Sequence, residues 1–378
     1  MADSTTEIYR PGLEGVVVAE TELSQVDGER GRLTVRGLPI ESLADGRFEA
    51  MAALLWDGST ADSTRVDVIA RRLGEARVAA HAELGRYSAA LDAPQPMDAL
   101  RAATAGLSPD PEGGTAERLH LTGALQVFAA AWHRRRIGAR PVRPDPDRSH
   151  AEDLLRMLHG HAATPAVSRA LDAYLVTVAE HGMNASTFTA RVVASTQSDA
   201  ISAVVAALGS LKGPLHGGAP GPVLDMLDAI GNPAKATDWL RAELDAGRRI
   251  MGLGHRVYRV RDPRAAVLEE TLLHLEAAGL ESRYLALARA VERAAVRELA
   301  ARYPERSLDT NVEFYTAVLL EVLGIPRELF TPLFACARVT GWLAHFEEQR
   351  DRGRIIRPRQ RYVGPVATSD RNTASNAS

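Results

Sequence analysis

Two histidines in glycine-framed loops are the first residues of this chain that could do chemistry. His216 lies in the segment Lys212–Gly218 (KGPLHGG), and His255 lies in Met251–Arg264 (MGLGHRVYRVRDPR). Glycine lets the backbone approach a ligand closely, so a titratable ring in such a loop can face a small substrate instead of the core.

Two further segments complete the set. Glu180–Arg191 (EHGMNASTFTAR) adds His181 and Asn184, and Asn311-Val312-Glu313 adds a carboxylate. Three imidazoles, one carboxylate and several arginines suit the removal of a carbon-bound proton next to a carbonyl while polyanionic substrates are held in place.

Each histidine also has a purely structural interpretation. His216 precedes a helix that we expect to begin near Pro222, and the positive end of that helix disfavours the imidazolium form. A neutral ring could donate a hydrogen bond to a developing enolate oxygen, but a loop histidine can equally bond only to backbone. His255 could be a satisfied structural residue, and its glycines match neither GxGxxG nor a P-loop.

The acid and one arginine leave similar alternatives open. Glu313 follows Asn311 in the first turn of an expected helix, where a carboxylate serves as a base or only complements the helix end. Arg338 shares one helical face with Phe334 and Trp342. A guanidinium on an apolar face needs an anion, which is either a protein carboxylate or a substrate.

Composition narrows the class of protein. The chain has 378 residues, of which 46% are hydrophobic, and a formal net charge of -3, so we expect a large core, two domains and no nucleic-acid or membrane partner. The start, MADSTTEIYRPG, lacks the apolar core of a signal peptide, and no apolar run reaches the roughly 18 residues that span a bilayer. The sequence predicts a soluble, cytoplasmic protein.

Metal and cysteine chemistry find little support. His159-Gly-His161 is the only close histidine pair, it lacks further ligands in register, and there is no HExxH motif, so we expect no metal site. Cys336 is the single cysteine and lies in an apolar helical segment, which indicates a core residue, no intrachain disulfide and a reducing compartment.

The elements that must position these residues are almost all helical. Val16–Leu23 and Leu33–Arg36 flank a turn at 27–31 and predict a two-stranded hairpin near the start. The remainder predicts an all-α protein, with helices that start at Thr164-Pro165, start at Ser198, cover Tyr284–Leu299, run from Asn311 to Gly324 and cover Arg327–Gln349. Ser108–Thr115 and Gly138–Ser149 are proline-rich polar connectors.

Taken together, the motifs resemble the citrate synthase family. The resemblance covers about 11 to 364, in order, and runs through VAETELSQVDGERG, MDALR, AEHGMNASTFTAR, LKGPLHGG, GLGHRVYRVRDPRA, NVEFY and IIRPRQRYVG. It implies a mostly helical homodimer that condenses acetyl-CoA with oxaloacetate and then hydrolyses the thioester, a step of the tricarboxylic acid cycle. It further implies a large helical domain of 11–214 plus 326–365 and a small domain of 215–325 that closes over the substrates. Tails at 1–10 and 366–378 are expected to be flexible and disordered.

The resemblance also implies a role for each matching residue. His216 would bond the enol oxygen of acetyl-CoA, His255 would polarise the oxaloacetate ketone, and Glu313 would take the methyl proton. No cofactor would be bound permanently, because acetyl-CoA is a co-substrate. Other matching positions are those that hold oxaloacetate (His181, Asn184, Arg264, Arg338 and Arg357, the last reaching into the partner subunit's site) and the one that meets CoA phosphate (Arg259).

Two departures indicate a divergent branch of that family. The usual base is aspartate, whereas Glu313 is longer by one methylene, a shift of roughly 1.5 Å that could cost about a hundredfold in rate unless the backbone compensates. The usual HGGAN reads HGGAP here, with Pro220. Three alternatives therefore stay open: a 2-methylcitrate synthase that uses propionyl-CoA, a weakly active or inactive paralogue that binds oxaloacetate or acyl-CoA, and a helical scaffold with merely structural loops.

Overall fold

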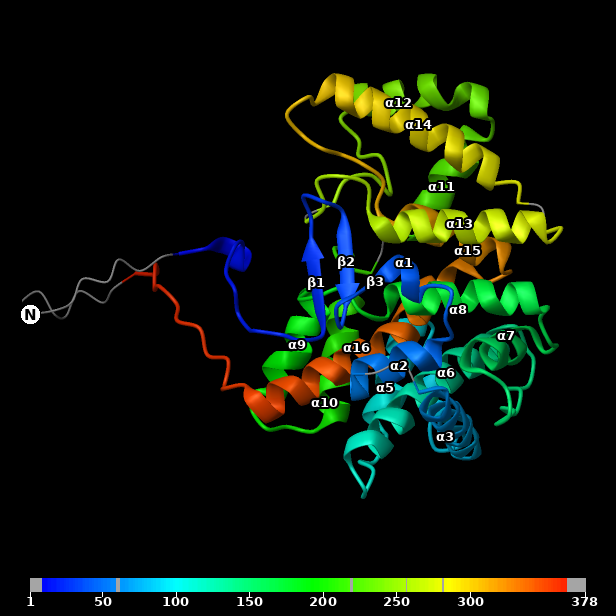
Figure 1. The fold of residues 1–378 in the computed structure, drawn as a ribbon, viewed down its shortest axis with the longest axis vertical. Helices are drawn as coiled ribbons and strands as arrows, with labels where there is room; N and C mark the ends of the chain where they lie inside the picture. The colour runs from blue at the N-terminus through cyan, green and yellow to red at the C-terminus, as the bar shows by residue number, and fades with distance from the viewer. Residues whose placement is uncertain (1–8, 59–61, 218–219, 256, 281, 366–378) are drawn as a thin grey trace, which may run out of the picture.

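The computed structural model describes the chain from Tyr9 to Pro365, with gaps at 59–61, 218–219, 256 and 281. It is a helical protein with one small sheet beside the helices (Figure 1), which confirms the predicted all-α class. The predicted tails at 1–10 and 366–378 fall largely outside the described residues, which include only Tyr9 and Arg10 of the first.

The sheet has three antiparallel strands in the order β1-β2-β3. They cover Ser24–Asp27, Arg32–Val35 and Leu38–Pro39. The turn was predicted correctly, but the prediction of a strand at Val16–Leu23 is wrong. Only Leu23 at its end is buried, with its carbonyl accepting the Arg36 N–H at 2.8 Å, whereas Val17 is 86% exposed. Among the described residues, the earlier part of the segment pairs with no strand and so lacks the ladder bonds and buried face that a strand needs.

Helices account for most of the remaining chain. Within the described ranges, the 3₁₀ helices are η1 (Pro11–Leu13), η2 (Pro233–Lys235) and η3 (Arg327–Leu329). The α-helices are α1 (Ile40–Leu43), α2 (Phe48–Asp57), α3 (Ser63–Ala82), α4 (Ser88–Leu91), α5 (Pro96–Ala105), α6 (Gly114–Arg136), α7 (His150–His159), α8 (Pro165–Ala179), α9 (Ala185–Ala194), α10 (Ala200–Leu211), α11 (Pro220–Ile230), α12 (Ala236–Asp245), α13 (Pro263–Ala277), α14 (Leu285–Arg302), α15 (Val312–Val322) and α16 (Phe330–Arg352).

Helix boundaries follow the caps that the sequence indicates. Thr164 caps α8 and Asn311 caps α15, as predicted. The cap of α10 is Asp199, one residue after the predicted start, and its Oδ1 accepts the backbone N–H of Ser202 at 2.8 Å. Short polar side chains thus satisfy the free N–H groups of a helix start and fix where each helix begins.

The core lies around the long helices α6 and α16, whose residues are mostly buried. Cys336 of α16 is fully buried, and burial raises the pKa of its thiol to about 12, which confirms a core residue. Helices α11 to α14 gather at one end of the molecule, and α3 and α5 lie toward the other (Figure 1). Among the described residues, no helix is both long and apolar enough to cross a membrane.

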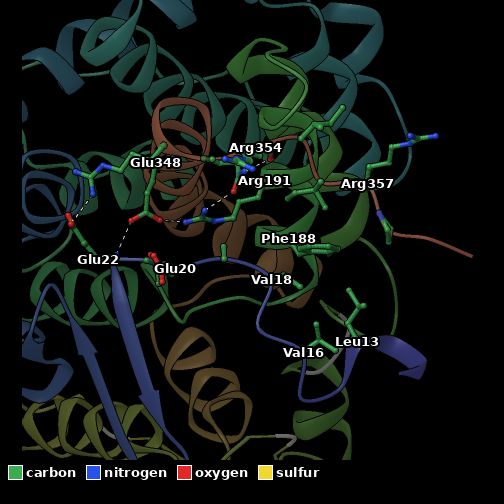
Figure 2. Close-up of a pocket in the computed structure, with 18 residues that line it drawn as sticks. Leu13, Val16, Val18, Glu20, Glu22, Phe188, Arg191, Glu348, Arg354 and Arg357 are labelled. Atoms are coloured by element: carbon green, nitrogen blue, oxygen red, sulfur yellow. Dashed lines mark hydrogen bonds and ion pairs between the residues drawn. The ribbon is translucent and has the colours of Figure 1, made fainter. Parts of the chain in front are cut away.

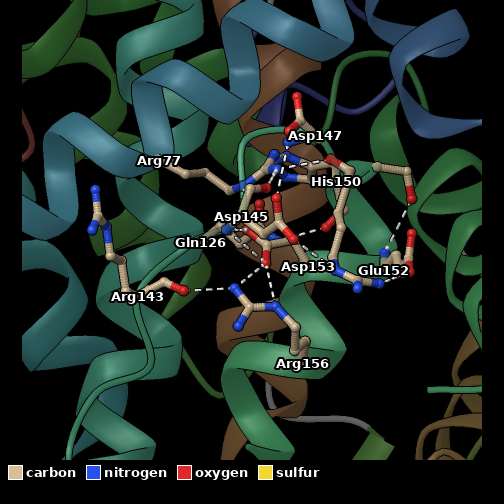
Figure 3. Close-up of polar contacts among 11 residues, drawn as sticks. Arg77, Gln126, Arg143, Asp145, Asp147, His150, Glu152, Asp153 and Arg156 are labelled. Carbon is tan, nitrogen blue, oxygen red and sulfur yellow. Dashed lines mark hydrogen bonds and ion pairs between the residues drawn. The ribbon is translucent and has the colours of Figure 1, made fainter. Parts of the chain in front are cut away.

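A buried polar network joins α3, α6 and α7 (Figure 3). The Arg77 guanidinium, fully buried, donates from Nε to Asp153 Oδ2 at 2.9 Å and from Nη2 to the carbonyl of Arg148 at 2.9 Å. Gln126 of α6 donates to the carbonyl of His150 at 2.6 Å. The connector at 138–149 has no helix or strand, as predicted, and this network fixes it to the helices.

Candidate active site

The loop that carries His255 is joined to the start of α15. Leu253 and Thr310 form an antiparallel bridge, and Gly254 N–H donates to the Asp309 carbonyl at 2.7 Å. Gly252 has a φ of 74°, and a Cβ there would lie 2.8 Å from Phe314 Cδ2, so this close approach requires glycine. Two segments that are far apart in sequence are thereby held against each other.

Asn311 extends this junction. Its Oδ1 accepts the N–H of Glu313 at 3.0 Å, and its Nδ2 donates to the Gly254 carbonyl at 2.9 Å. One side chain therefore caps α15 and holds the residue before His255. The sequence indicated only the cap; the bond to Gly254 depends on the fold.

The tautomer of His255 follows from its hydrogen bonds. Its Nδ1 accepts backbone N–H groups from Val257 at 3.0 Å and Tyr258 at 3.1 Å. The ring proton therefore lies on Nε2, where it can be donated to a carbonyl oxygen. Burial, with a contribution from Arg264, lowers the pKa of His255 to about 4, so the ring is neutral at neutral pH.

His181 lies next to His255. Their ring centroids are 5.5 Å apart at 86°, and the Tyr258 ring lies 4.8 Å from that of His255. The Nε2 of His181 is buried without a hydrogen-bond partner in the described part of the chain. Burial, and then the nearby cations Arg264 and Arg338, lower the pKa of His181 well below its usual value. A buried ring nitrogen without a partner is suited to bond a ligand.

The carboxylate of Glu313 lies at the start of α15. Within the described residues, no hydrogen bond or ion pair reaches its side-chain oxygens. Burial raises its pKa to about 7, although Arg264 and Arg338 favour the anion. A carboxyl group with a pKa close to neutral suits a general base, because it is ionised in part and still accepts a proton readily.

Arg338 decides one alternative that the sequence left open. Its side chain is buried, its Nε donates to the Val178 carbonyl at 2.7 Å, and the Phe334 ring lies 4.6 Å away. Among the described residues, no carboxylate lies within ion-pair distance of the guanidinium and neither Nη group has a partner. The part of the chain that the structure describes therefore offers Arg338 no internal salt bridge, which favours an external anion.

Arg264 differs from Arg338 because it already has a counter-ion. Its Nε and Nη2 donate to the two carboxylate oxygens of Asp262 at 3.0 and 2.8 Å, and both residues are buried. Asp262 also accepts the N–H of Val312 at 3.2 Å. Asp262 was not singled out from the sequence, although an aspartate directly before a proline at a helix start is a recognisable cap.

His216 is held by a side chain, not by backbone alone. Its Nε2 lies 2.8 Å from Ser186 Oγ, and that hydroxyl also contacts Trp342 Nε1 at 3.1 Å and Asn184 Oδ1 at 2.8 Å. Burial, and then Arg338, lower the pKa of His216 to about 4, so the ring is neutral at neutral pH. Ser186 was missed by the sequence analysis. Helix α11 begins at Pro220, two residues before the predicted Pro222.

Two shared cations connect these residues. Arg338 lowers the pKa of His181, His216 and Glu313, and Arg264 lowers those of His181, His255 and Glu313. Because such effects weaken quickly with distance, the three rings and the acid belong to one electrostatic cluster. Asn184 has a structural task as well, since its Oδ1 caps α9 by accepting Thr187 N–H at 3.0 Å.

Arg357 and Arg259 lie apart from the buried cluster. Arg357 is exposed in the extended segment after α16 and lines a cavity of about 660 Å³ between the two terminal segments. Figure 2 shows Arg191 and Glu348 facing each other while Arg357 extends outward. Arg259 is exposed, and its backbone N–H donates to the Gly28 carbonyl at 2.9 Å.

His159 and His161, the close pair at which the sequence predicts no metal site, have ordinary contacts. His159 and His161 have stacked rings 5.9 Å apart, and His159 Nε2 lies 3.1 Å from the Leu323 carbonyl oxygen. Over the part of the chain that the structure describes, no three His, Cys, Asp or Glu side chains are grouped as metal ligands.

Comparison with known proteins gives consistent matches. The family model described as "Citrate synthase, C-terminal domain" matches residues 12–359. A citrate synthase of Haloferax volcanii is 39% identical over 372 residues, covering 93% of this chain and 95% of the relative. Citrate synthase 2 of Bacillus subtilis is 37% identical over 364 residues, with 94% and 95% covered.

Solved structures agree with these relatives. A citrate synthase of Thermotoga maritima superposes with a TM-score of 0.84 at 35% identity, covering 95% of this chain and 97% of that one. Another, from Thermoplasma acidophilum, is a ternary complex with carboxymethyl coenzyme A and oxaloacetate. It gives a TM-score of 0.84 at 27% identity and covers 96% and 98%.

Proposed function

Because the chain belongs to the citrate synthase family, we propose that His216, His255 and Glu313 catalyse the condensation of acetyl-CoA with oxaloacetate. The chain is an acyltransferase that forms a C–C bond, in which the acetyl group becomes an alkyl group of the product. Hydrolysis of the citryl-CoA thioester then gives citrate and CoA.

The proposed proton transfer starts at Glu313. Its carboxylate takes a proton from the acetyl methyl group, and His216 donates a hydrogen bond to the thioester oxygen as the enol forms. The methyl carbon attacks the ketone carbon of oxaloacetate, and the ketone oxygen takes up a proton as His255 donates from Nε2. The Glu313 carboxyl, which has no side-chain partner among the described residues, carries this assignment, and burial that raises its pKa to about 7 supports it.

The remaining residues are proposed to bind the substrates. Among the described residues, no group contacts the Nη atoms of Arg338 or the Nε2 of His181, so the first can bind one carboxylate of oxaloacetate and the second can bond it beside His255. Arg264, Asn184 and Arg259 complete the set, with Arg259 facing CoA phosphate. We also propose a homodimer in which the exposed Arg357 reaches the partner subunit's site, and no cofactor other than acetyl-CoA as co-substrate.

The 2-methylcitrate alternative differs by one methylene in the acyl group. A pocket discriminates such a pair by only about 1–3 kcal/mol, and no described residue favours propionyl-CoA. An inactive paralogue is disfavoured, because the neutral histidines, the unpaired acid and the unpaired arginine are all present.

One assay tests the proposal directly. Release of free CoA is measured with oxaloacetate and either acetyl-CoA or propionyl-CoA, and the product is identified. We expect citrate from acetyl-CoA at the higher kcat/KM. No CoA release from either thioester would refute the function, and faster turnover of propionyl-CoA would establish the alternative. The Glu313→Asp variant then shows whether the site has adapted to the longer acid.

A further inference from the structure

Glu180, between α8 and α9, is a fully buried carboxylate next to His181. Its Oε1 accepts three hydrogen bonds, from Ser24 Oγ at 2.8 Å, from Gly182 N–H at 2.5 Å and from His345 Nε2 at 3.0 Å. These donors come from β1, from the loop before α9 and from α16. A side chain held from three directions has one orientation.

The direction of the His345 bond is fixed by a neighbour. Arg191 Nε donates to His345 Nδ1 at 2.9 Å, so the ring proton lies on Nε2 and is donated to Glu180. Burial alone would raise the pKa of Glu180, but His345, followed by Arg338 and Ser24, lowers it to about 2. Glu180 therefore carries a negative charge inside the protein at neutral pH.

The second oxygen of Glu180 is unusual. Oε2 is buried and has no hydrogen-bond partner within the described residues. A Cβ at Gly341 would lie 2.6 Å from this oxygen, so a side chain there would displace the carboxylate. Gly341 follows Arg338 by about one turn of α16, so Glu180 lies near Arg338. The charges of Glu180 and Arg338 influence each other, although no ion pair joins them.

Arg338 needs a negative charge that stabilises its cation without forming hydrogen bonds to its Nη groups. Burial lowers the pKa of Arg338 to about 10, and Glu180 is the foremost group that opposes this shift. A carboxylate in direct contact would satisfy the guanidinium but would also compete with any ligand. A carboxylate held at a distance stabilises the cation and leaves its donors free.

We propose that Glu180 is a positioning residue for oxaloacetate binding. His345, Ser24 and Gly182 hold its charge close enough to stabilise Arg338 but out of contact, so that both Nη groups of Arg338 remain available to a substrate carboxylate. This inference rests on the proposed function, because it concerns the same carboxylate site.

The two partners should act on affinity in opposite directions. In Glu180→Gln, Arg338 loses its foremost internal counter-charge and oxaloacetate meets one negative charge fewer at the site, so the dissociation constant for oxaloacetate should fall about tenfold. In His345→Phe, Glu180 loses a donor and can turn toward Arg338, and the substrate must displace it. The dissociation constant should then rise about tenfold.

The double variant separates this mechanism from simple damage. Once Glu180 has no charge, the hydrogen bond from His345 no longer keeps a carboxylate away from Arg338. Glu180→Gln/His345→Phe should therefore bind oxaloacetate as tightly as Glu180→Gln alone. If the network only supports the fold, both single variants should bind oxaloacetate more weakly. Their losses of binding free energy should then add up in the double variant.

The test is calorimetric titration of oxaloacetate into the full-length protein, with the melting temperature recorded for each variant. Glu49→Gln is the matched control, because Glu49 is equally buried but lies in the other polar cluster, where its Oε1 accepts the N–H of His150 at 2.7 Å. It should lower the melting temperature without changing affinity.

The outcomes separate this inference from the proposed function. If the wild type releases no CoA with oxaloacetate, the function is wrong. If it releases CoA and Glu180→Gln weakens oxaloacetate binding, the inference is wrong. Should either buried variant fail to fold, Ser24→Ala removes one donor to Glu180 from the hairpin. We expect a twofold to fivefold weaker binding there, and an unchanged affinity would overturn the proposal.

Discussion

Two buried polar clusters in this molecule differ in whether their arginine forms an ion pair. Around Arg77 the guanidinium contacts the Asp153 carboxylate and two backbone carbonyls (Figure 3). Around Arg338 the guanidinium contacts one carbonyl, while the nearest acids influence it without an ion pair. Both arginines are almost completely buried, so exposure to solvent does not explain the difference.

The comparison separates structural from functional charge. A charge paired at contact distance offsets its desolvation inside the fold and holds helices together. A buried charge without an ion pair keeps part of its desolvation cost, which a counter-charge held at a distance, such as Glu180, offsets only in part until a ligand anion binds. Variants in the first cluster should therefore change stability and spare activity, and those in the second should do the reverse.

Glu313→Gln should give the largest effect. Loss of a general base lowers kcat by roughly 10²–10⁴-fold, while oxaloacetate still binds Arg338. Removing a buried carboxyl that resists ionisation should leave the melting temperature equal or higher. Steady-state kinetics, oxaloacetate titration and thermal melting check the three parts. Undiminished condensation would show that Glu313 is not the base.

Asp153→Asn tests the opposite cluster. It leaves the Arg77 cation buried without its carboxylate partner, which should cost about 3–5 kcal/mol of unfolding free energy. Denaturant titration measures the loss, and kcat/KM assayed below the unfolding transition should match the wild type. A specific loss of kcat/KM in still-folded protein would mean that the two clusters are coupled.

Much of this site could be anticipated from sequence because its residues lie in short glycine-containing motifs. Asn311 as the cap of α15, Thr164 as the cap of α8 and Cys336 in the core needed only local patterns. The segment at Val16–Leu23 was misjudged, since β-prone residues make a strand only when a partner strand is present.

The residues that were missed act across long stretches of chain. Ser186 bonds His216, 30 residues away, and Asp262 bonds the N–H of Val312, 50 residues away. Glu180 and His345 are separated by 165 residues. Nothing in a local pattern tells a paired arginine such as Arg77 from Arg338, because the partner of Arg77 is Asp153, 76 residues away, and the fold brings the two together.

Arg338→Met should come next in size. Losing charged hydrogen bonds to a substrate carboxylate costs about 3 kcal/mol, or roughly a hundredfold in the KM for oxaloacetate. Because this buried cation has no ion pair, the unfolding free energy should fall far less than in Asp153→Asn. A loss of stability as large as that of Asp153→Asn, with an unchanged KM, would reverse the assignment of the two clusters.

The pH dependence of kcat/KM should report the ionisation of Glu313. Glu313 must be ionised to act as a base and its pKa is raised to about 7, so kcat/KM for oxaloacetate should fall about tenfold per pH unit below pH 7. His216 and His255, with pKa values lowered to about 4, stay neutral across that range. A profile that is flat from pH 5 to 8 would contradict the raised pKa.

The same shift links pH to stability with a definite sign. A carboxyl whose folded-state pKa is raised from 4.5 to about 7 stabilises the fold below pH 4.5, and this contribution is lost as the pH rises through 7. Glu313→Gln should remove that part of the pH dependence of the unfolding free energy. Asp153→Asn should leave it in place, because Asp153 belongs to the other cluster.

Gly28→Ala should have the smallest effect and tests how the hairpin positions the site. A Cβ at Gly28 would lie 2.2 Å from the Val257 carbonyl oxygen, and Arg259 N–H bonds Gly28 next to it. The new methyl group must push the hairpin turn off the loop that follows His255, and we expect kcat/KM to fall about tenfold. Gly209→Ala is the matched control, since a Cβ there meets nothing within 4 Å. Equal kinetics for the two variants would show that the hairpin contact does not position His255.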